Sequence, residues 1–578
     1  MSYSIAWAYL AAAAVVAVAI PKVRQRLDLS AAKHRSLAGH ARWSRRFARQ
    51  VPYYEYDESE FFRADGADDE LADRRRAGFL RLAEQLRSRH REGAALSAQA
   101  EPAISDLQFV NRYRVPFQFS AVARRHLKTG SFVTASSGVQ VVDVDGNEAY
   151  DLAGSYGVNL LGYDFYKQCI ERAVARAGSL GPVLGSYHPV VIDNVDRLRR
   201  ISGLDEVSFH MSGTEAVMQA VRLARYHTGR THVVRFCGAY HGWWGDVQPG
   251  IGNPMPADST YTLADMSDAA LRVLESRTDL ACVLVNPLQA LHPNKAAPGD
   301  STLVAAARTA GFDRASYSDW LHRLRDVCTR RGIPLIFDEV FLGFRLSRGG
   351  AQQYFGVRAD LVTYGKTLGG GLPVGVLCGR AALMRRFRED RPADICFARG
   401  TFNAHPYVMT AMNEFLIVLD EEPAVAALYA GLDETWQRRA QQLNEALERE
   451  GVPIHVRGLS TVWVVCHSQD SRYHWMLQFY LRAAGLALSW VGTGRCIFSL
   501  NYTDNDFAEV VSRFIAAARQ MQADGWWETP PGFSSVAVQR RILVEMVRVR
   551  LGLPAVSARR RSPRDCHAAE PEAPCDRA

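Results

Sequence analysis

Short apolar runs alternate with amphipathic stretches through the middle of the chain. The runs are rich in Val, Ile, Leu and aromatic residues, which is typical of buried strands. Stretches with apolar positions at helical spacing separate them, for example from Ser318 to Arg330. Strands that alternate with helices indicate a mostly parallel sheet covered on both faces, so we expect a large α/β domain. The predicted strands are 207–211, 231–236, 280–285, 333–337, 361–364 and 374–378.

The pattern differs on either side of this region. Before it, the charged stretch 68–91 has an apolar stripe that predicts a helix, and 139–150 reads as a hairpin turning at Asp145-Gly146-Asn147. After about Pro406, two helical stretches precede short strands, which indicates a smaller α+β domain. These helices are predicted at 407–420 and 428–450, the strands at 462–466 and 496–500, and an amphipathic helix at 534–551, before a polar tail that we expect to be disordered.

The N-terminus is apolar and is followed by a basic segment. Residues 1–21 carry no charged side chain, whereas Lys22 to Arg49 contains nine Lys or Arg against one acid. We expect a single-pass membrane anchor with the catalytic domain on the cytoplasmic side. A cleaved signal peptide is the alternative, because Ala17-Val18-Ala19 resembles a cleavage site. The basic segment would face anionic lipid, which accounts for the net charge of +8 without a nucleic-acid partner.

Two predicted strands end in residues whose chemistry is complementary. Asp338-Glu339 follows the strand at 333–337, and Gly365-Lys366 follows the strand at 361–364. The carboxyl ends of parallel strands form the ligand crevice of such a sheet. A lysine can form a Schiff base with an aldehyde, and an aspartate can keep a pyridinium nitrogen protonated. We therefore predict a site for pyridoxal phosphate (PLP), with Lys366 and Asp338 as the catalytic residues. No Cys/His spacing indicates a metal site among the ten cysteines.

Two more motifs fall at the ends of predicted strands. Ser212-Gly213-Thr214-Glu215-Ala216 opens a helix, where free backbone N–H groups and the helix dipole favour a phosphate, although the motif is equally a capped helix start. Gly238-Ala239-Tyr240-His241-Gly242 brings an aromatic side chain to the same edge of the sheet. It could stack on a planar ring or simply close the domain surface.

In this order, the motifs resemble the class III (subgroup II) aminotransferases, especially the glutamate-1-semialdehyde aminomutase branch. The resemblance covers about residues 117–524 and rests on SGTEAVMQAVRLARYHTGR, GAYHG, the IFDEV to LPVG block and GTFNAHP. It implies a type I PLP-dependent transferase fold and a homodimer with sites at the subunit interface. It also implies that Lys366 is the Schiff-base lysine and Asp338 the pyridinium partner. The other cofactor contacts that it implies are Ser212, Gly213, Thr214, Tyr240, His241, Val340 and, toward the neighbouring subunit, Thr401.

The chain departs from the family pattern around the expected substrate pocket. Asn286-Pro287 replaces a frequent Glu-Pro, Leu291 falls about where ω-aminotransferases have a gating glutamate, and Phe341-Leu342 is more apolar than usual. Ser155 and Tyr156 lie where the aminomutase has pocket residues, so we expect Ser155, Tyr156, Asn286 and Phe341 to line the pocket. Arg112 and Arg114 are the candidates for the family's carboxylate-binding arginine.

Together these features predict a membrane-tethered, PLP-dependent aminotransferase. Its acceptor would be a ketone or aldehyde, possibly on a hydrophobic or carrier-bound chain. An intramolecular aminomutase and a non-catalytic PLP-binding membrane scaffold are the alternatives. The expected segments are an anchor (1–21), a basic juxtamembrane segment and helical linker (22–110), a PLP-binding large domain (111–405), a small domain (406–527) and a C-terminal helix with a disordered tail (528–578).

Overall fold

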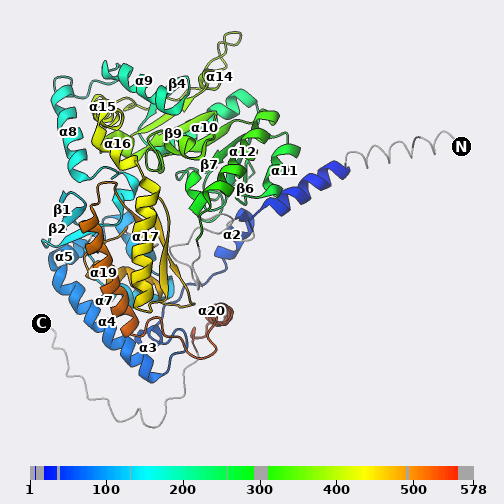
Figure 1. Ribbon diagram of the computed structural model, residues 1–578. Helices are drawn as coiled ribbons and strands as arrows, with labels where there is room; N and C mark the ends of the chain where they lie inside the picture. The colour runs from blue at the N-terminus through cyan, green and yellow to red at the C-terminus, as the bar shows by residue number, and fades with distance from the viewer. Residues whose placement is uncertain are drawn as a thin grey trace, which may run out of the picture.

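The computed structural model describes residues 7, 19–34, 39–130, 132–256, 258–291, 310–489 and 494–556. Within these residues the chain forms a seven-stranded sheet and two smaller sheets of four and three strands (Figure 1). Helices pack around all three, so the α/β prediction is confirmed.

The seven-stranded sheet has the order β4-β10-β9-β8-β7-β5-β6. Its neighbours from β6 to β9 are parallel, whereas β10 runs antiparallel to both β4 and β9. The prediction of a mostly parallel sheet is therefore confirmed. The antiparallel direction of β10 was not predicted, because an apolar run does not indicate the direction of its strand. The strands are β4 (Glu206–His210), β5 (His232–Phe236), β6 (Thr260–Leu263), β7 (Leu280–Val285), β8 (Leu335–Asp338), β9 (Leu361–Gly365) and β10 (Gly375–Gly379).

Helices cover both faces of this sheet, and side-chain alternation along each strand divides the core accordingly. On one face α10 (Gly213–Thr228) packs against Cys282 and Leu284 of β7. On the other, α12 (Arg314–Arg331) belongs to the cluster that contains Val283 and Val285. Every residue of β7, β8 and β9 is buried, as expected for strands covered on both sides. The second face also carries α9 (Val190–Ser202), α11 (Asp268–Ser276) and α13 (Gly350–Phe355).

The two smaller sheets join distant parts of the chain. In the four-stranded sheet, β13 (Leu486–Ala487) pairs in parallel with β3 (Glu148–Asp151), which in turn pairs with β2 (Gln140–Asp143) in the predicted hairpin. The remaining strands are β1 (Val133–Ser137), and β11 (Ile454–Leu459), β12 (Val462–His467) and β14 (Arg495–Ile497) in the three-stranded sheet.

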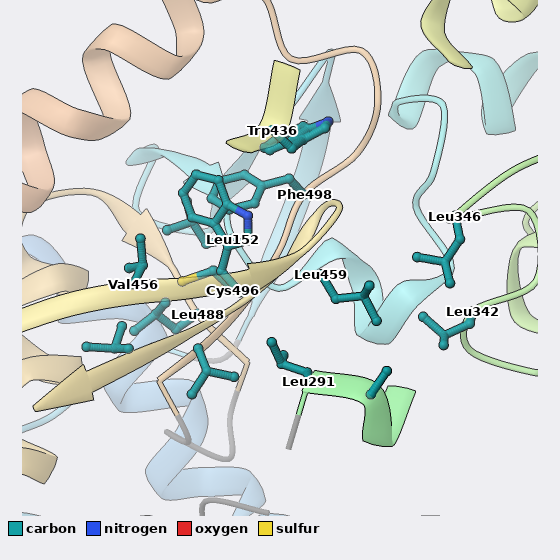
Figure 2. Close-up of a cluster of buried hydrophobic side chains, with 14 of the residues drawn as sticks. Leu152, Leu291, Leu342, Leu346, Trp436, Val456, Leu459, Leu488, Cys496 and Phe498 are labelled. Carbon is teal, nitrogen blue, oxygen red and sulfur yellow. The ribbon is translucent and has the colours of Figure 1, made fainter. Parts of the chain in front are cut away.

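The region after about residue 406, here called the small domain, packs on the preceding region, here called the large domain, through a continuous apolar cluster. Figure 2 shows Trp436 and Phe498 beside Leu152, with Leu342 and Leu346 in the same close-up. All five belong to one buried cluster, so the two regions share a core there. The helices of this region are α15 (Pro406–Glu421), α16 (Pro423–Tyr429), α17 (Leu432–Arg449), α18 (Leu477–Ala483) and α19 (Asp504–Ala523).

The helices predicted at 68–91 and 534–551 are present as α4 (Asp69–Arg89) and α20 (Ser535–Arg550). Helix α20 is held by Glu545, whose Oε2 accepts hydrogen bonds from the hydroxyls of Tyr54 (2.9 Å) and Tyr56 (2.7 Å). A segment near residue 55 and a helix near the C-terminus therefore pack together. The other helices are α2 (Ala41–Ala48), α3 (Glu58–Phe61), α5 (Arg91–Ala100), α6 (Ser105–Tyr113), α7 (Ser120–His126), α8 (Tyr163–Ala177) and α14 (Ala381–Met384).

The predicted membrane anchor has to be corrected. Among the described residues, no helix combines the length and the apolar character that crossing a bilayer requires. The helix at 19–32 carries Lys22, Arg24, Arg26 and Asp28, so it is strongly polar. Residues 1–6 and 8–18 of the expected span lie outside the described residues. The prediction of a single-pass membrane protein is therefore wrong for the part of the chain that the structure describes.

The basic segment that was expected to face lipid packs on the large domain instead. Arg42 forms an ion pair with Asp258 (3.2 Å), and Arg45 donates to the backbone carbonyl of Asn253 (3.1 Å). The side chain of Gln25 donates to the carbonyl of Ser276 at the end of α11 (2.8 Å). Acceptors on the large domain therefore pair with two of the arginines in this segment.

Candidate active site

Lys366 and Asp338 face one cavity of about 1030 Å³ at the carboxyl edge of the large sheet. Asp338 is the last residue of β8, and Lys366 follows the last residue of β9. Because β8 and β9 are adjacent parallel strands, their ends lie side by side, and Asp338 pairs in register with Thr363. The fold thereby brings together the two residues that the sequence singles out.

Lys366 is held in an unusual environment. Its backbone φ is +46°, a conformation that a non-glycine residue adopts only when its surroundings enforce it. Burial lowers the pKa of Lys366, the charge of Asp338 opposes that shift, and Arg345 adds to it. A lowered pKa enlarges the fraction of free amine, which is the nucleophilic form. Nζ lies 5.8 Å from the centroid of the Phe341 ring.

Asp338 is oriented by three donors. Its Oδ1 accepts from the backbone N–H of Val340 (3.1 Å) and the hydroxyl of Thr363 (3.4 Å), and its Oδ2 lies 2.8 Å from Nδ1 of His241. Burial lowers the pKa of His241, although Asp338 opposes the shift. Since a carboxylate can only accept, Nδ1 of His241 carries the donated proton. These bonds fix the carboxylate toward the cavity.

The N-terminus of α10 forms a cradle that lines the same cavity. Its cap is Ser212, whose hydroxyl accepts from the N–H of Glu215 (3.3 Å). The N–H groups of Gly213 and Thr214, in the first turn, have no intrahelical acceptor. A Cβ on Gly213 would lie 2.5 Å from Val340 Cγ1, so the backbone approaches too closely for any side chain. Such a cradle suits a phosphate group.

Aromatic and apolar residues form the cavity walls. Tyr240 and Val340 both line the cavity, and the amide of Asn286 donates to the carbonyl of Tyr240 (3.3 Å). Phe341 packs so closely on Gly157 that a Cβ there would lie 2.7 Å from its ring. Tyr156 lines the cavity from a loop in which its own φ is +57°.

Arg345 ties this loop to the small domain. Its side chain is only 1% exposed and donates to the carbonyls of Gly157 and Asn159, both at 3.1 Å. It also donates to the carbonyl of Phe498 (2.7 Å) and the hydroxyl of Thr461 (3.1 Å). One buried guanidinium thus connects the pocket loop to two segments of the small domain.

Most of the predicted site residues line this one cavity, and two do not. The hydroxyl of Ser155 lies 3.0 Å from that of Tyr163 and points away from the cavity lining. Thr401 lies in an exposed turn outside the cavity. The predicted residues that do line it are Tyr156, Ser212, Gly213, Thr214, Tyr240, His241, Asn286, Asp338, Val340, Phe341 and Lys366.

The sequence did not identify the cavity residues that other segments contribute. Leu288 comes from the turn after β7, and Ser489 and Arg495 come from the small domain. Arg495 immediately precedes the strand predicted at 496–500, a position that gives no sign of a ligand role without the fold. The arginines proposed for carboxylate binding lie elsewhere: Arg112 packs over the ring of Tyr53 (4.7 Å), and Arg114 lines a different pocket.

The groups that line this cavity could bind a phosphorylated pyridine aldehyde. A glycine-lined helix N-terminus can bind the phosphate, a buried carboxylate faces the cavity, and a lysine of lowered pKa can react with the aldehyde. The three groups line the same cavity, so one molecule can contact all of them.

Comparisons with known proteins agree with this geometry. The family model for class-III aminotransferases matches residues 121–518. A glutamate-1-semialdehyde 2,1-aminomutase of Geotalea daltonii is 32% identical over 375 residues, which cover 62% of this chain and 80% of that protein.

Solved structures of similar fold include aminotransferases and an aminomutase. An omega-transaminase from Sphaerobacter thermophilus aligns with a TM-score of 0.57 and 26% identity, over 68% of this chain and 91% of that one. A glutamate-1-semialdehyde-aminomutase from Pseudomonas aeruginosa aligns with a TM-score of 0.62, over 78% of this chain and 99% of that one. At 18% identity the second likeness shows the fold alone.

Proposed function

Because this chain belongs to the class III aminotransferase family, whose cofactor is pyridoxal phosphate, we propose that it moves an amino group on a small substrate, with Lys366 and Asp338 as its catalytic residues. The observation that carries the proposal is that both side chains share one cavity with the glycine-lined N-terminus of α10. A phosphate and a reactive carbonyl on one molecule can therefore be held at once.

Each group of the cofactor has a matching partner in the chain. Ser212, Gly213 and Thr214 would hold the phosphate, and Lys366 would hold the aldehyde carbon covalently. Tyr240 and Val340 would flank the ring faces, and the Asp338 carboxylate would accept a hydrogen bond from the ring nitrogen. When bound, PLP supplies an electron sink that stabilises negative charge on the substrate carbon that loses a proton.

The chain's own residues supply positioning and proton transfer. The Lys366 amine, with its lowered pKa, can accept the substrate proton as a general base and return it as a general acid. His241 holds the Asp338 carboxylate in one orientation through the 2.8 Å bond to Oδ2. Phe341 and Leu288 present apolar surface to the cavity and exclude water from part of it.

Transfer within one molecule, as in an aminomutase, is the reaction that we favour. Its support is the name of relatives that are 32% identical over most of their length, glutamate-1-semialdehyde 2,1-aminomutase. The guanidinium of Arg495 at the cavity favours a substrate that carries a carboxylate or another anion.

Transfer between two molecules is the second candidate. Its support is the omega-transaminase likeness, at 26% identity over 91% of that chain. A hydrophobic or carrier-bound acceptor now rests on the apolar Phe341-Leu342 and on Leu291 at the position of the gating glutamate, because the anchor that also suggested it has been corrected.

A donor and acceptor screen on the purified holoenzyme tests these reactions. The absorbance of bound PLP is followed while a simple amino acid, or a compound bearing both an amine and an aldehyde, is added alone. Product from the second compound without any acceptor indicates the mutase. Product that forms only when a separate ketone or aldehyde is present indicates the aminotransferase. If no amine changes the absorbance, the chain binds PLP without turnover, as a scaffold would, and the proposal is wrong.

We also propose a homodimer in which the turn at Thr401 contacts the neighbouring subunit's site. Thr401 lies outside its own cavity, and the adjacent Phe402 is 48% exposed, which an interface would cover. Light scattering of the purified protein measures the assembly state. A monomer that retains full activity would contradict the proposal.

A further inference from the structure

A second cavity, separate from the cofactor site, lies between α5, α6 and α7 and has a volume of about 210 Å³. That space suits a small ion or a short ester but is smaller than the pockets that take drug-sized ligands. Its lining is basic, with four cationic side chains and one acid. The cations are Arg114, Arg124, Arg125 and Lys128, and the acid is Glu101.

Two of these cations already have partners outside the pocket. Arg124 approaches Glu55 at 3.7 Å, and Arg125 forms an ion pair with Glu58 at 3.1 Å. In contrast, no carboxylate within the described residues lies at ion-pair distance from Arg114 or Lys128. Within the described residues neither side chain therefore has a carboxylate in direct contact, although Glu101 lines the same pocket.

Arg114 is the more unusual of the two because it is only 8% exposed. One of its terminal nitrogens donates to the hydroxyl of Thr129, whereas its Nε has no hydrogen-bond partner. Burial lowers the pKa of Arg114 to about 10, so the group still carries its charge at neutral pH. Burying a cation without a counter-charge is unfavourable unless another group compensates it.

A second, partly buried guanidinium lies close enough to repel that of Arg114. Arg482 donates to the carbonyls of Leu488 (2.9 Å) and Ser489 (2.8 Å), which are neutral acceptors. Burial lowers its pKa to about 9, and repulsion from Arg114 contributes. Two like charges thus sit together beside a basic pocket.

We propose that this pocket binds a small tetrahedral oxyanion, as inorganic phosphate or as the phosphate group of a short ester. Arg114 would contact it from the floor of the pocket and Lys128 from the rim, with the Asn111 amide as a further donor. A doubly charged anion would balance the two cations that lack carboxylate partners.

The pocket is distinct from the cofactor's phosphate cradle. None of its lining residues lines the cofactor cavity. Tyr156 stands between them, since it lines the cofactor cavity and also interacts electrostatically with Arg114. In the holoenzyme the cradle at α10 is occupied by the cofactor, so added phosphate reports on the second pocket.

Equilibrium dialysis of the holoenzyme with labelled inorganic phosphate, in chloride buffer of constant ionic strength, tests the proposal. We expect saturable binding of one phosphate per chain beyond that of the cofactor. Glycerol phosphate serves as the second arm: tighter binding than inorganic phosphate identifies an ester as the ligand, and weaker binding identifies the free ion.

Substitutions locate the binding. Arg114→Gln and Lys128→Gln should each weaken phosphate binding by about tenfold or more, the effect of losing one charged hydrogen bond. Lys128 is exposed, so its variant remains informative if Arg114→Gln fails to fold. Arg457→Gln, which removes an equal charge at an exposed position of β11, is the matched control and should leave binding unchanged. Absence of saturable binding, or equal affinities for Lys128→Gln and Arg457→Gln, overturns the proposal.

Discussion

Nδ1 of His241 lies 2.8 Å from Oδ2 of Asp338, and both side chains are buried at the end of β8. The histidine follows β5 and the aspartate ends β8, so the contact joins two strand ends on either side of β7. Because burial favours the neutral imidazole, the ring donates to the carboxylate without neutralising it. A ring nitrogen stays protonated when a carboxylate is held beside it in a buried site.

Asp338→Asn tests that role. A neutral amide cannot keep the pyridine nitrogen protonated, so the rate of amino transfer should fall by about a thousandfold or more, roughly 4 kcal/mol in the barrier. The variant should still bind PLP, since the phosphate cradle and Lys366 are unchanged. Single-turnover rates and the bound-cofactor spectrum measure the two effects. A rate within about tenfold of wild type would exclude the role.

Lys366→Ala removes the amine that is proposed both to hold the cofactor and to move the proton. Turnover should be lost, while the circular dichroism and the melting temperature stay near those of wild type, because the lysine lies at a cavity wall and not in the core. Lys167→Ala, which alters an exposed lysine on α8, is the control and should retain full activity. Turnover that survives in Lys366→Ala would place the catalytic amine elsewhere.

The sequence predicted the strands and the proximity of Asp338 and Lys366 because both follow from local pattern. Apolar runs identify buried strands, and the ends of adjacent parallel strands must meet, so Asp338 and Lys366 could be paired before the fold was known. The direction of a strand could not be predicted in this way. The sequence of β10 has the same apolar pattern as those of its neighbours, but β10 is antiparallel to them.

Contacts between distant segments could not be predicted at all. The parallel pairing of Leu486 with Tyr150 depends on how the small domain folds back, and the same packing brings Arg495 to the cavity. The N-terminal error has a similar cause. Composition shows that Lys22 to Arg49 is basic, but not that Arg42 has Asp258 as a partner.

Arg495→Ala tests whether the cavity recognises an anionic substrate. Removal of the guanidinium should raise KM for a carboxylated substrate by about tenfold to a hundredfold, the effect of one charged hydrogen bond. For a simple uncharged amine, kcat/KM should change little, and Arg495→Lys should recover part of the affinity. Equal losses for charged and uncharged substrates would mean that Arg495 supports the structure and not the substrate.

Arg345→Ala should destabilise the protein by about 1–3 kcal/mol, the cost of leaving a buried acceptor without its donor. Four acceptors, in the pocket loop and the small domain, would lose their donor. Urea unfolding measures the loss, and Arg345→Lys should recover only part of it, because an ammonium cannot reach all four acceptors. Arg519→Ala, on exposed α19, is the control. A loss no larger than that of the control would contradict the bridging role.

The buried His210 should make a contribution to folding stability that is lost in mild acid. Burial, reinforced by Arg386, lowers its pKa from an unfolded value of about 6.5 to about 4 in the folded protein. Between these values the unfolded chain binds a proton that the folded chain does not, so stability decreases as pH falls through this window, by up to about 3 kcal/mol. Above pH 6.5 both states are neutral and the contribution is complete. The urea midpoint at pH 5, relative to that at pH 7, should therefore be higher in His210→Gln than in wild type, because the variant lacks this loss in acid. The comparison between variants is essential, since burial raises the pKa of Glu339 to about 7 and gives a dependence of opposite sign in both proteins.

His322→Gln, at an exposed position on α12, should keep the wild-type difference. A His210→Gln protein with the same difference as wild type would show that His210 is protonated equally in both states.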